Sequence, residues 1–97
     1  MLSAERKVGS ATILQIEGTR LDAAIAPGFK DAIKAYVDRG ERHIVIDLVN
    51  VQFMDSSGLG ALVGALKYMG REGRIELANP GDAVMKVLRL TRMNKVF

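Results

Sequence analysis

The chain has 97 residues, enough for one domain over residues 1–97, and an apolar content of 48% excludes intrinsic disorder. It contains no cysteine, which excludes disulfides, thiolate zinc sites and a cysteine nucleophile and favours a cytoplasmic location. The net charge of +3 is too weak for a dedicated nucleic-acid binder, and no apolar run approaches the ~20 residues that cross a bilayer. We therefore expect neither nucleic acid nor membrane as a partner.

The first half of the chain predicts two strands and a helix. Residues 2–8 form a candidate first strand, 9–10 a tight turn and 11–17 a second strand. Residues 18–22 indicate a connection. From 24 to 39 the apolar period becomes that of an amphipathic surface helix. Its apolar stripe consists of Ile25, Phe29, Ala32, Ile33, Tyr36 and Val37.

The segment HIVIDL at 43–48 is short, β-branched and almost wholly apolar. These features are typical of a strand in a mostly parallel sheet, covered on both faces. Residues 51–54 extend this strand or form a second short one. A helix is expected from the polar residues 55–57 to about Met69. Its core stripe consists of Leu59, Leu62, Val63, Leu66 and Met69.

The last part of the chain predicts a strand at 74–78 and a third helix at about 83–92, with Asp82 as its N-cap. The inner stripe of this helix consists of Val84, Val87, Leu88 and Thr91. Residues 93–97 are a candidate for a short edge strand.

The alternation of strands and helices predicts an α/β fold, a mixed β-sheet of four to five strands with amphipathic helices packed against it. Right-handed crossovers between parallel strands place consecutive helices on one face of such a sheet.

One segment, FMDSSGLG at 53–60, combines features that point to function. A strand ends abruptly, a carboxylate and two hydroxyls follow, and a helix begins. Asp55 or Ser56 can simply cap this helix, which is the commoner role of such residues. The same helix start can also hold an anion, so a phosphate esterified to a serine here would be tolerated without unfolding.

Gly58, Gly60 and Gly64 lie in or at the edge of the same helix, where each interior glycine costs ~1 kcal/mol relative to alanine. Three such glycines suggest that another element or another molecule approaches this helix closely. On a helical wheel Gly60 and Gly64 share one side with Ala61 and Tyr68. A docking surface for another protein and coverage by another element of this domain explain this side equally well.

The sequence shows no constellation typical of an enzyme. His43 opens a candidate buried strand and is expected to be a strand-end residue rather than a catalytic base. There is no GxSxG elbow, the glycine spacing differs from GxGxxG, and no histidine–carboxylate cluster indicates a metal site. We expect no enzyme activity, no catalytic residue, no cofactor and no metal.

The string FMDSSGLGAL at 53–62 resembles the signature of the anti-sigma factor antagonists, which have the STAS fold. Supporting similarities are the GxxLD turn at 18–22, the HIVIDL strand and the AVMKVLRL helix at 83–90. The resemblance covers nearly the whole chain.

The resemblance implies a partner switch in the bacterial cytoplasm. In this family the unphosphorylated antagonist binds an anti-sigma factor, also a serine kinase of the GHKL type, and so releases a sigma factor or another regulator. Phosphorylation by the kinase abolishes binding, and a PP2C-type phosphatase restores it. By resemblance the phosphorylated residue is Ser57, in a chain that is a monomer or weak dimer. The implied partner-binding residues are Asp22, Asp55, Ser56, Ser57, Gly58, Leu59 and Gly60.

Two departures from the family pattern are visible. Relatives often continue with a further strand and helix, so we expect a chain that is trimmed at its C-terminus or a short member. Arg20 stands in a turn where many relatives carry an acidic residue, which could alter the choice of partner.

The alternatives to a partner switch are a STAS module of a transporter or lipid-transport complex, and a domain that binds nucleotide at the serine-rich helix start. The pair Asp55 and Ser57 favours the switch.

Overall fold

The structure of the protein, a computed structural model, describes residues 2–93 and the side chains of residues 5–93. Strands and helices follow one another in the order expected for an α/β domain. Their bounds are β1 (Leu2–Val8), β2 (Ala11–Ile16), β3 (Arg20–Leu21), α1 (Ala26–Asp38), β4 (His43–Asp47), β5 (Phe53–Met54), α2 (Ser56–Met69), β6 (Arg74–Ala78) and α3 (Asp82–Leu90).

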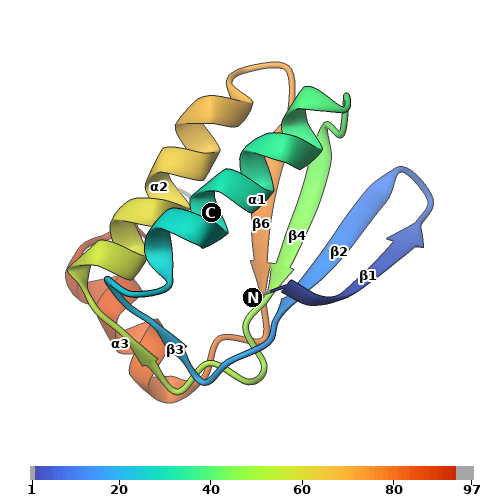
Figure 1. Ribbon diagram of the computed structural model, residues 1–97. Helices are drawn as coiled ribbons and strands as arrows, with labels where there is room; N and C mark the ends of the chain where they lie inside the picture. The colour runs from blue at the N-terminus through green and yellow to red at the C-terminus, as the bar shows by residue number, and fades with distance from the viewer. Residues whose placement is uncertain (1, 94–97) are drawn as a thin grey trace.

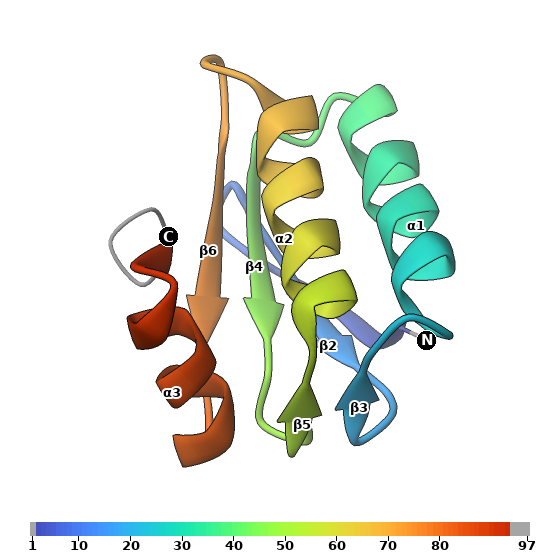
Figure 2. The same ribbon diagram turned by 90° about the vertical axis from the view of Figure 1, so that its left-hand side faces the viewer.

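The main sheet has four strands in the order β1-β2-β4-β6. Strand β1 runs antiparallel to β2, whereas β2, β4 and β6 are parallel to one another. Strands β3 and β5 form a separate two-stranded parallel sheet. Figures 1 and 2 show all three helices on one side of the main sheet, with the β3–β5 pair below it. The predicted mixed sheet with amphipathic helices is confirmed, and so is the placement of the helices on one face.

The prediction that the HIVIDL strand is covered on both faces is wrong. Ile44 and Ile46 are fully buried under the helices, whereas His43, Val45 and Asp47 on the other face are partly exposed. Because both crossovers have the same hand, the two connecting helices cover the same face and leave the other uncovered.

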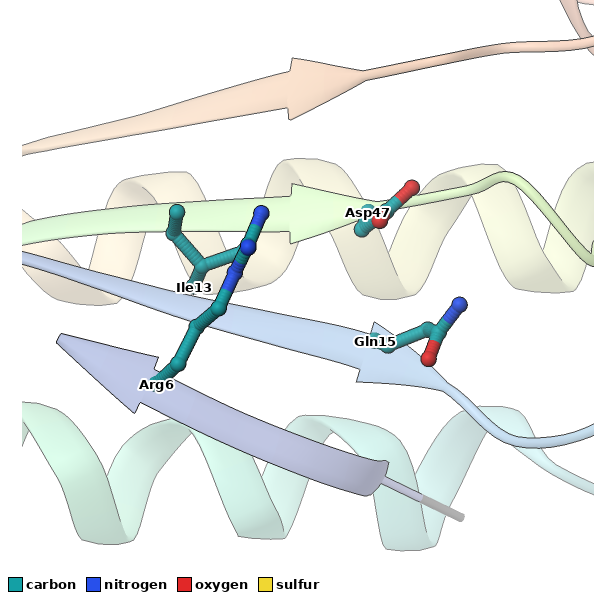
Figure 3. Close-up of a pocket in the computed structure, with 4 residues that line it drawn as sticks. All are labelled: Arg6, Ile13, Gln15 and Asp47. Carbon is teal, nitrogen blue, oxygen red and sulfur yellow. The ribbon is translucent and has the colours of Figure 1, made fainter. Parts of the chain in front are cut away.

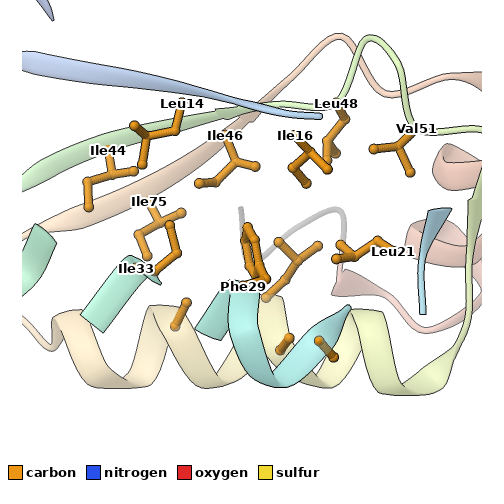
Figure 4. Packing of buried hydrophobic residues seen from close by; sticks show 14 of the residues in the cluster. Leu14, Ile16, Leu21, Phe29, Ile33, Ile44, Ile46, Leu48, Val51 and Ile75 are labelled. Carbon is orange, nitrogen blue, oxygen red and sulfur yellow. The ribbon is translucent and has the colours of Figure 1, made fainter. Parts of the chain in front are cut away.

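The core lies between the sheet and helices α1 and α2 (Figure 4). Phe29, Ile33 and Val37 of α1 are buried as predicted, and Leu62 and Met69 of α2 are buried as well. The other predicted stripe positions of α1 and α2 are only partly buried, whereas Val84 and Leu88 of α3 are buried as predicted. The helices also bury three alanines that the periodicity did not single out, namely Ala26, Ala61 and Ala65.

Helix α3 departs from the prediction at both ends. It begins after Gly81, which holds the N-cap position without a side-chain hydrogen bond, so Asp82 is the first helical residue and not the cap. At the other end Thr91 is exposed, and its hydroxyl donates to the Val87 carbonyl at 2.8 Å. Met93 packs against the core outside any strand, and the rest of the expected edge strand, 94–97, lies outside the described residues.

Candidate functional site

The two-stranded sheet brings two predicted site residues together. Leu21 of β3 pairs with Met54 of β5 in parallel register, and the backbone N–H of Asp55 donates to the Leu21 carbonyl at 3.4 Å. Asp22 and Asp55 directly follow these paired strands, and Figure 2 shows the ends of β3 and β5 side by side. The sequence indicated only a connection at 18–22, whereas β3 is the element that places Asp22.

Asp55 is the N-cap of α2. Its backbone is extended, and its carboxylate accepts a hydrogen bond from the Gly58 N–H at 2.9 Å. Ser56 and Ser57 follow within the first turn and are exposed, and in residues 5–93 their hydroxyls make no hydrogen bond to the protein. Because the Asp55 carboxylate is the side-chain cap of α2, neither serine hydroxyl is used for capping, and both are available to another molecule.

The three glycines of α2 have different structural reasons. Gly58 is buried, and a Cβ there would lie 2.0 Å from the Leu21 carbonyl oxygen, so only glycine lets α2 approach β3. A Cβ at Gly64 would meet the Lys30 side chain at 3.1 Å. A Cβ at Gly60 would meet nothing within 4 Å. The packing therefore requires glycine at 58 but not at 60.

A shallow groove of about 430 Å³ separates the first turns of α1 and α2. Its floor and walls are small or flexible side chains, with one cation and one hydroxyl. The lining residues are Ala26, Pro27, Lys30, Ser57, Gly60 and Ala61. Leu59 instead packs against the core, so it contributes to the shape of this end of the domain rather than to the groove.

Helix α1 covers most of the small-residue side of α2. Ala61 is buried, and the Tyr68 hydroxyl donates to the Asp38 carboxylate at 2.7 Å. The Lys34 ammonium lies 5.0 Å from the centre of the Tyr68 ring. The hydrogen bond to Asp38 raises the pKa of Tyr68. Coverage by another element therefore explains this side, except at Gly60, which stays exposed.

Arg20 links Asp22 to an exposed aromatic ring. The Arg20 guanidinium lies 4.2 Å from the centre of the Phe53 ring, and its Nε donates to the Asp22 carboxylate at 3.0 Å. This hydrogen bond lowers the pKa of Asp22 from its ordinary value of 3.8. The second carboxylate oxygen accepts from the Ala24 N–H at 3.1 Å, so Asp22 is held in place on both sides.

A family model described as the STAS domain matches residues 4–97. The chain belongs to the STAS domain family. An anti-sigma-B factor antagonist of Listeria monocytogenes is 32% identical over 77 residues, 78% of this chain and 68% of that protein. A STAS-domain containing protein of Pseudomonas aeruginosa is 33% identical over 90 residues, 92% of this chain and 87% of that protein.

Among solved structures, an anti-sigma factor antagonist from Mycobacterium paratuberculosis superposes with a TM-score of 0.85. It is 28% identical, and the match covers 97% of this chain and 80% of that one. Within residues 2–93 of this STAS domain, no helix is long and apolar enough to cross a membrane.

A second hollow, of about 320 Å³, lies on the uncovered face of the sheet (Figure 3). It is lined by Arg6, Ile13, Gln15 and Asp47, none of which is a predicted site residue. Asp47 accepts hydrogen bonds from the Val49 N–H at 3.0 Å and the Asn79 amide at 3.1 Å. The Asp47 carboxylate therefore holds the loop after β4 and the loop after β6 together through hydrogen bonds.

His43 is the first residue of β4, as expected of a strand-end residue. Its Nε2 forms a hydrogen bond with the Glu76 carboxylate on β6, which lowers the pKa of Glu76. Across residues 5–93 no group of three histidines and carboxylates is arranged to hold a metal ion.

The structure thus gathers the predicted site residues at one end of the domain and adds Lys30, Arg20 and Phe53 to them. No motif marks Lys30, whereas Phe53 opens the FMDSSGLG segment and Arg20 stands out in the sequence only as a departure from the family pattern. Lys30 joins the site through the packing of α1 on α2, and Arg20 joins Phe53 through the pairing of two very short strands.

Proposed function

We propose that this STAS domain is an anti-sigma factor antagonist controlled by phosphorylation of Ser57. Its unphosphorylated form binds an anti-sigma factor that is also a GHKL-type serine kinase, and this binding releases a sigma factor or another regulator. The observation that supports the proposal most is the Ser57 hydroxyl, which is exposed and makes no hydrogen bond within residues 5–93, beside a helix start that Asp55 already caps. The names of the Listeria and Mycobacterium relatives support the same role.

The docking surface divides into residues that contact the partner and residues that shape the surface. Ser56, Ser57 and Gly60 are exposed and can touch a partner directly. Asp22 and Asp55 are partly exposed carboxylates beside them. The remaining two predicted residues, Gly58 and Leu59, act through shape: Gly58 is buried against β3, and Leu59 packs on the core.

The modification transfers the γ-phosphoryl group of ATP to the Ser57 hydroxyl oxygen. The new oxygen–phosphorus bond forms as the bond between the γ-phosphorus and the bridging oxygen breaks, ADP leaves, and the hydroxyl proton is released. Hydrolysis by a PP2C-type phosphatase returns the serine and inorganic phosphate. The antagonist supplies only the acceptor, so it needs no catalytic residue of its own.

Phosphorylation changes the charge of the docking surface more than it changes the fold. The phosphate adds about −1.5 to −2 charges at pH 7, two residues after the carboxylate of Asp55. The positive end of the α2 dipole tolerates that charge within the domain. A partner that packs over the same turn would have to bury a hydrated dianion, which costs far more than the ~1.4 kcal/mol of a tenfold change in affinity. Binding is therefore lost by repulsion and desolvation.

The test compares Ser57→Asp with Ser56→Asp for binding to the anti-sigma factor encoded nearest to the gene, measured by titration calorimetry. The two variants carry the same added charge on neighbouring exposed positions, and circular dichroism checks that both are folded. We expect Ser57→Asp to weaken binding at least tenfold and more than Ser56→Asp. Wild-type affinity in a folded Ser57→Asp protein would refute the proposed switch.

A further inference from the structure

The groove between α1 and α2 places one unpaired cation on the same surface as Ser57. Lys30 extends from α1 and is the cation among the six residues that line this groove. In residues 5–93 its ammonium forms no ion pair or hydrogen bond, whereas Lys34, one turn later, lies over the Tyr68 ring. Lys30 is therefore the ammonium free to pair with a new anion in the groove.

Gly60 keeps the space between Lys30 and Ser57 open. An alanine at 60 would be the better helix former, and its Cβ would touch nothing within 4 Å. The packing of this domain gives no reason for glycine there. What the missing side chain provides is an unobstructed groove floor, formed by Gly60 and Ala61, between the Ser57 hydroxyl and the Lys30 stem.

We propose that Lys30 is the intramolecular counter-ion of phosphorylated Ser57, and that the phosphate–ammonium pair fills the groove over Gly60. This inference rests on the proposed modification of Ser57 and describes what the phosphate does after it is attached. The pair adds a second reason for loss of binding, because it occupies the surface that the unphosphorylated form offers to its partner.

A rotation of the lysine side chain would bring its ammonium closer to Ser57. Its ammonium lies beside Gly64, where a Cβ would be 3.3 Å from it. Gly64 lies about 10 Å along the helix axis from Ser57 and Gly60 about 4.5 Å, at 1.5 Å per residue. The flexible four-carbon stem of lysine can turn toward the N-terminus of α2 across Gly60, where no side chain blocks it.

The other charged groups at this end of the domain leave Lys30 as the cation available to a phosphate on Ser57. Asp55 at the start of α2 and Asp22 at the end of β3 both carry negative charge, and the Arg20 guanidinium is already paired with Asp22. From α1 the groove receives Lys30 and the uncharged Ala26 and Pro27. The carboxylates favour the singly charged phosphate and Lys30 favours the doubly charged one. Removing Lys30 should therefore raise the second pKa of the phosphate.

The experiment installs phosphoserine at position 57 during translation, so it needs neither kinase nor partner. Phosphorus NMR then follows the second ionisation of the phosphate in the full chain, in Lys30→Met and in the matched control Lys34→Met. We expect Lys30→Met to raise this pKa by about 0.5–1 unit, below the range for buried pairs because the site is exposed. Lys34→Met should match the parent, and Lys30→Arg should restore its value.

Equal pKa values in the parent and in Lys30→Met, or equal shifts in both methionine variants, would overturn the pairing. Because the phosphate is installed directly, this outcome is independent of whether a kinase modifies Ser57. If Lys30→Met leaves the phosphate pKa unchanged but Ser57→Asp loses binding, the pairing is wrong and the proposed function stands. If Lys30→Met raises the phosphate pKa but Ser57→Asp binds like the wild type, the pairing stands and the proposed function is wrong.

Discussion

Replacing Gly58 by alanine should destabilise the domain, whereas the same change two residues later should stabilise it. A Cβ at Gly58 would lie 2.0 Å from the carbonyl oxygen and 2.8 Å from the carbonyl carbon of Leu21. Because these are backbone atoms of a paired strand, no side-chain rotation relieves the clash, and α2 must move away from β3. Overpacking costs about 1–3 kcal/mol or more, and the gain in helix propensity offsets about 1 kcal/mol. A net loss of about 2 kcal/mol is expected.

Gly60→Ala is the matched control on the same turn. Its Cβ meets nothing within 4 Å, so only helix propensity changes, and the free energy of unfolding should rise by up to about 1 kcal/mol. Urea unfolding and thermal unfolding, both followed by circular dichroism, measure both variants. The melting temperature should fall by about 10 °C in Gly58→Ala and rise by about 4–8 °C in Gly60→Ala. Equal stability of the two variants would refute the assignment of Gly58 to packing and of Gly60 to the surface.

Three further predictions concern the charged groups. Asp55→Ala should lower the free energy of unfolding by about 1 kcal/mol through loss of the helix cap, while Asp55→Asn should retain most of it in the same urea assay. Arg20→Gln should return the pKa of Asp22 toward 3.8, measured by carboxyl carbon NMR, and an unchanged value would contradict the pairing. Hydrogen bonds with Arg20, Lys7 and His43 lower the pKa values of Asp22, Glu41 and Glu76, respectively, in the folded state. The stabilising contribution of these carboxylates is therefore present above the ordinary values of 3.8–4.5 and lost as the pH falls below them. Urea unfolding at pH 7, 5, 4 and 3 should show this decline, and stability that stays level across these values would contradict it.

Local chemistry explains why much of the fold could be predicted. The two long helices carry strong apolar periodicity. The start of α2 is marked in the sequence by Asp55 ahead of two serines, and Asp55 caps the helix in the structure. The strand at 74–78 is bounded by glycine and proline signals and has the expected ends. Each of these features depends on neighbours close in sequence, which a single chain reveals.

The rest depends on contacts between distant segments. Strand β3 has two residues, too few for any periodicity, and exists because it pairs with β5. The roles of the three glycines in α2 differ only because Leu21 and Lys30 lie against two of them. The uncovered face of the sheet follows from the hand of the crossovers, which an apolar run cannot show.

Intact-mass analysis tests most directly whether Ser57 is the phosphorylation switch of this STAS domain. The chain is incubated with ATP and the anti-sigma factor kinase encoded nearest to its gene, alongside Ser57→Ala and Ser56→Ala. We expect addition of one phosphoryl group in the parent chain and in Ser56→Ala, and none in Ser57→Ala. Modification that persists in Ser57→Ala, or no modification of the parent by an active kinase that binds it, would contradict the claim.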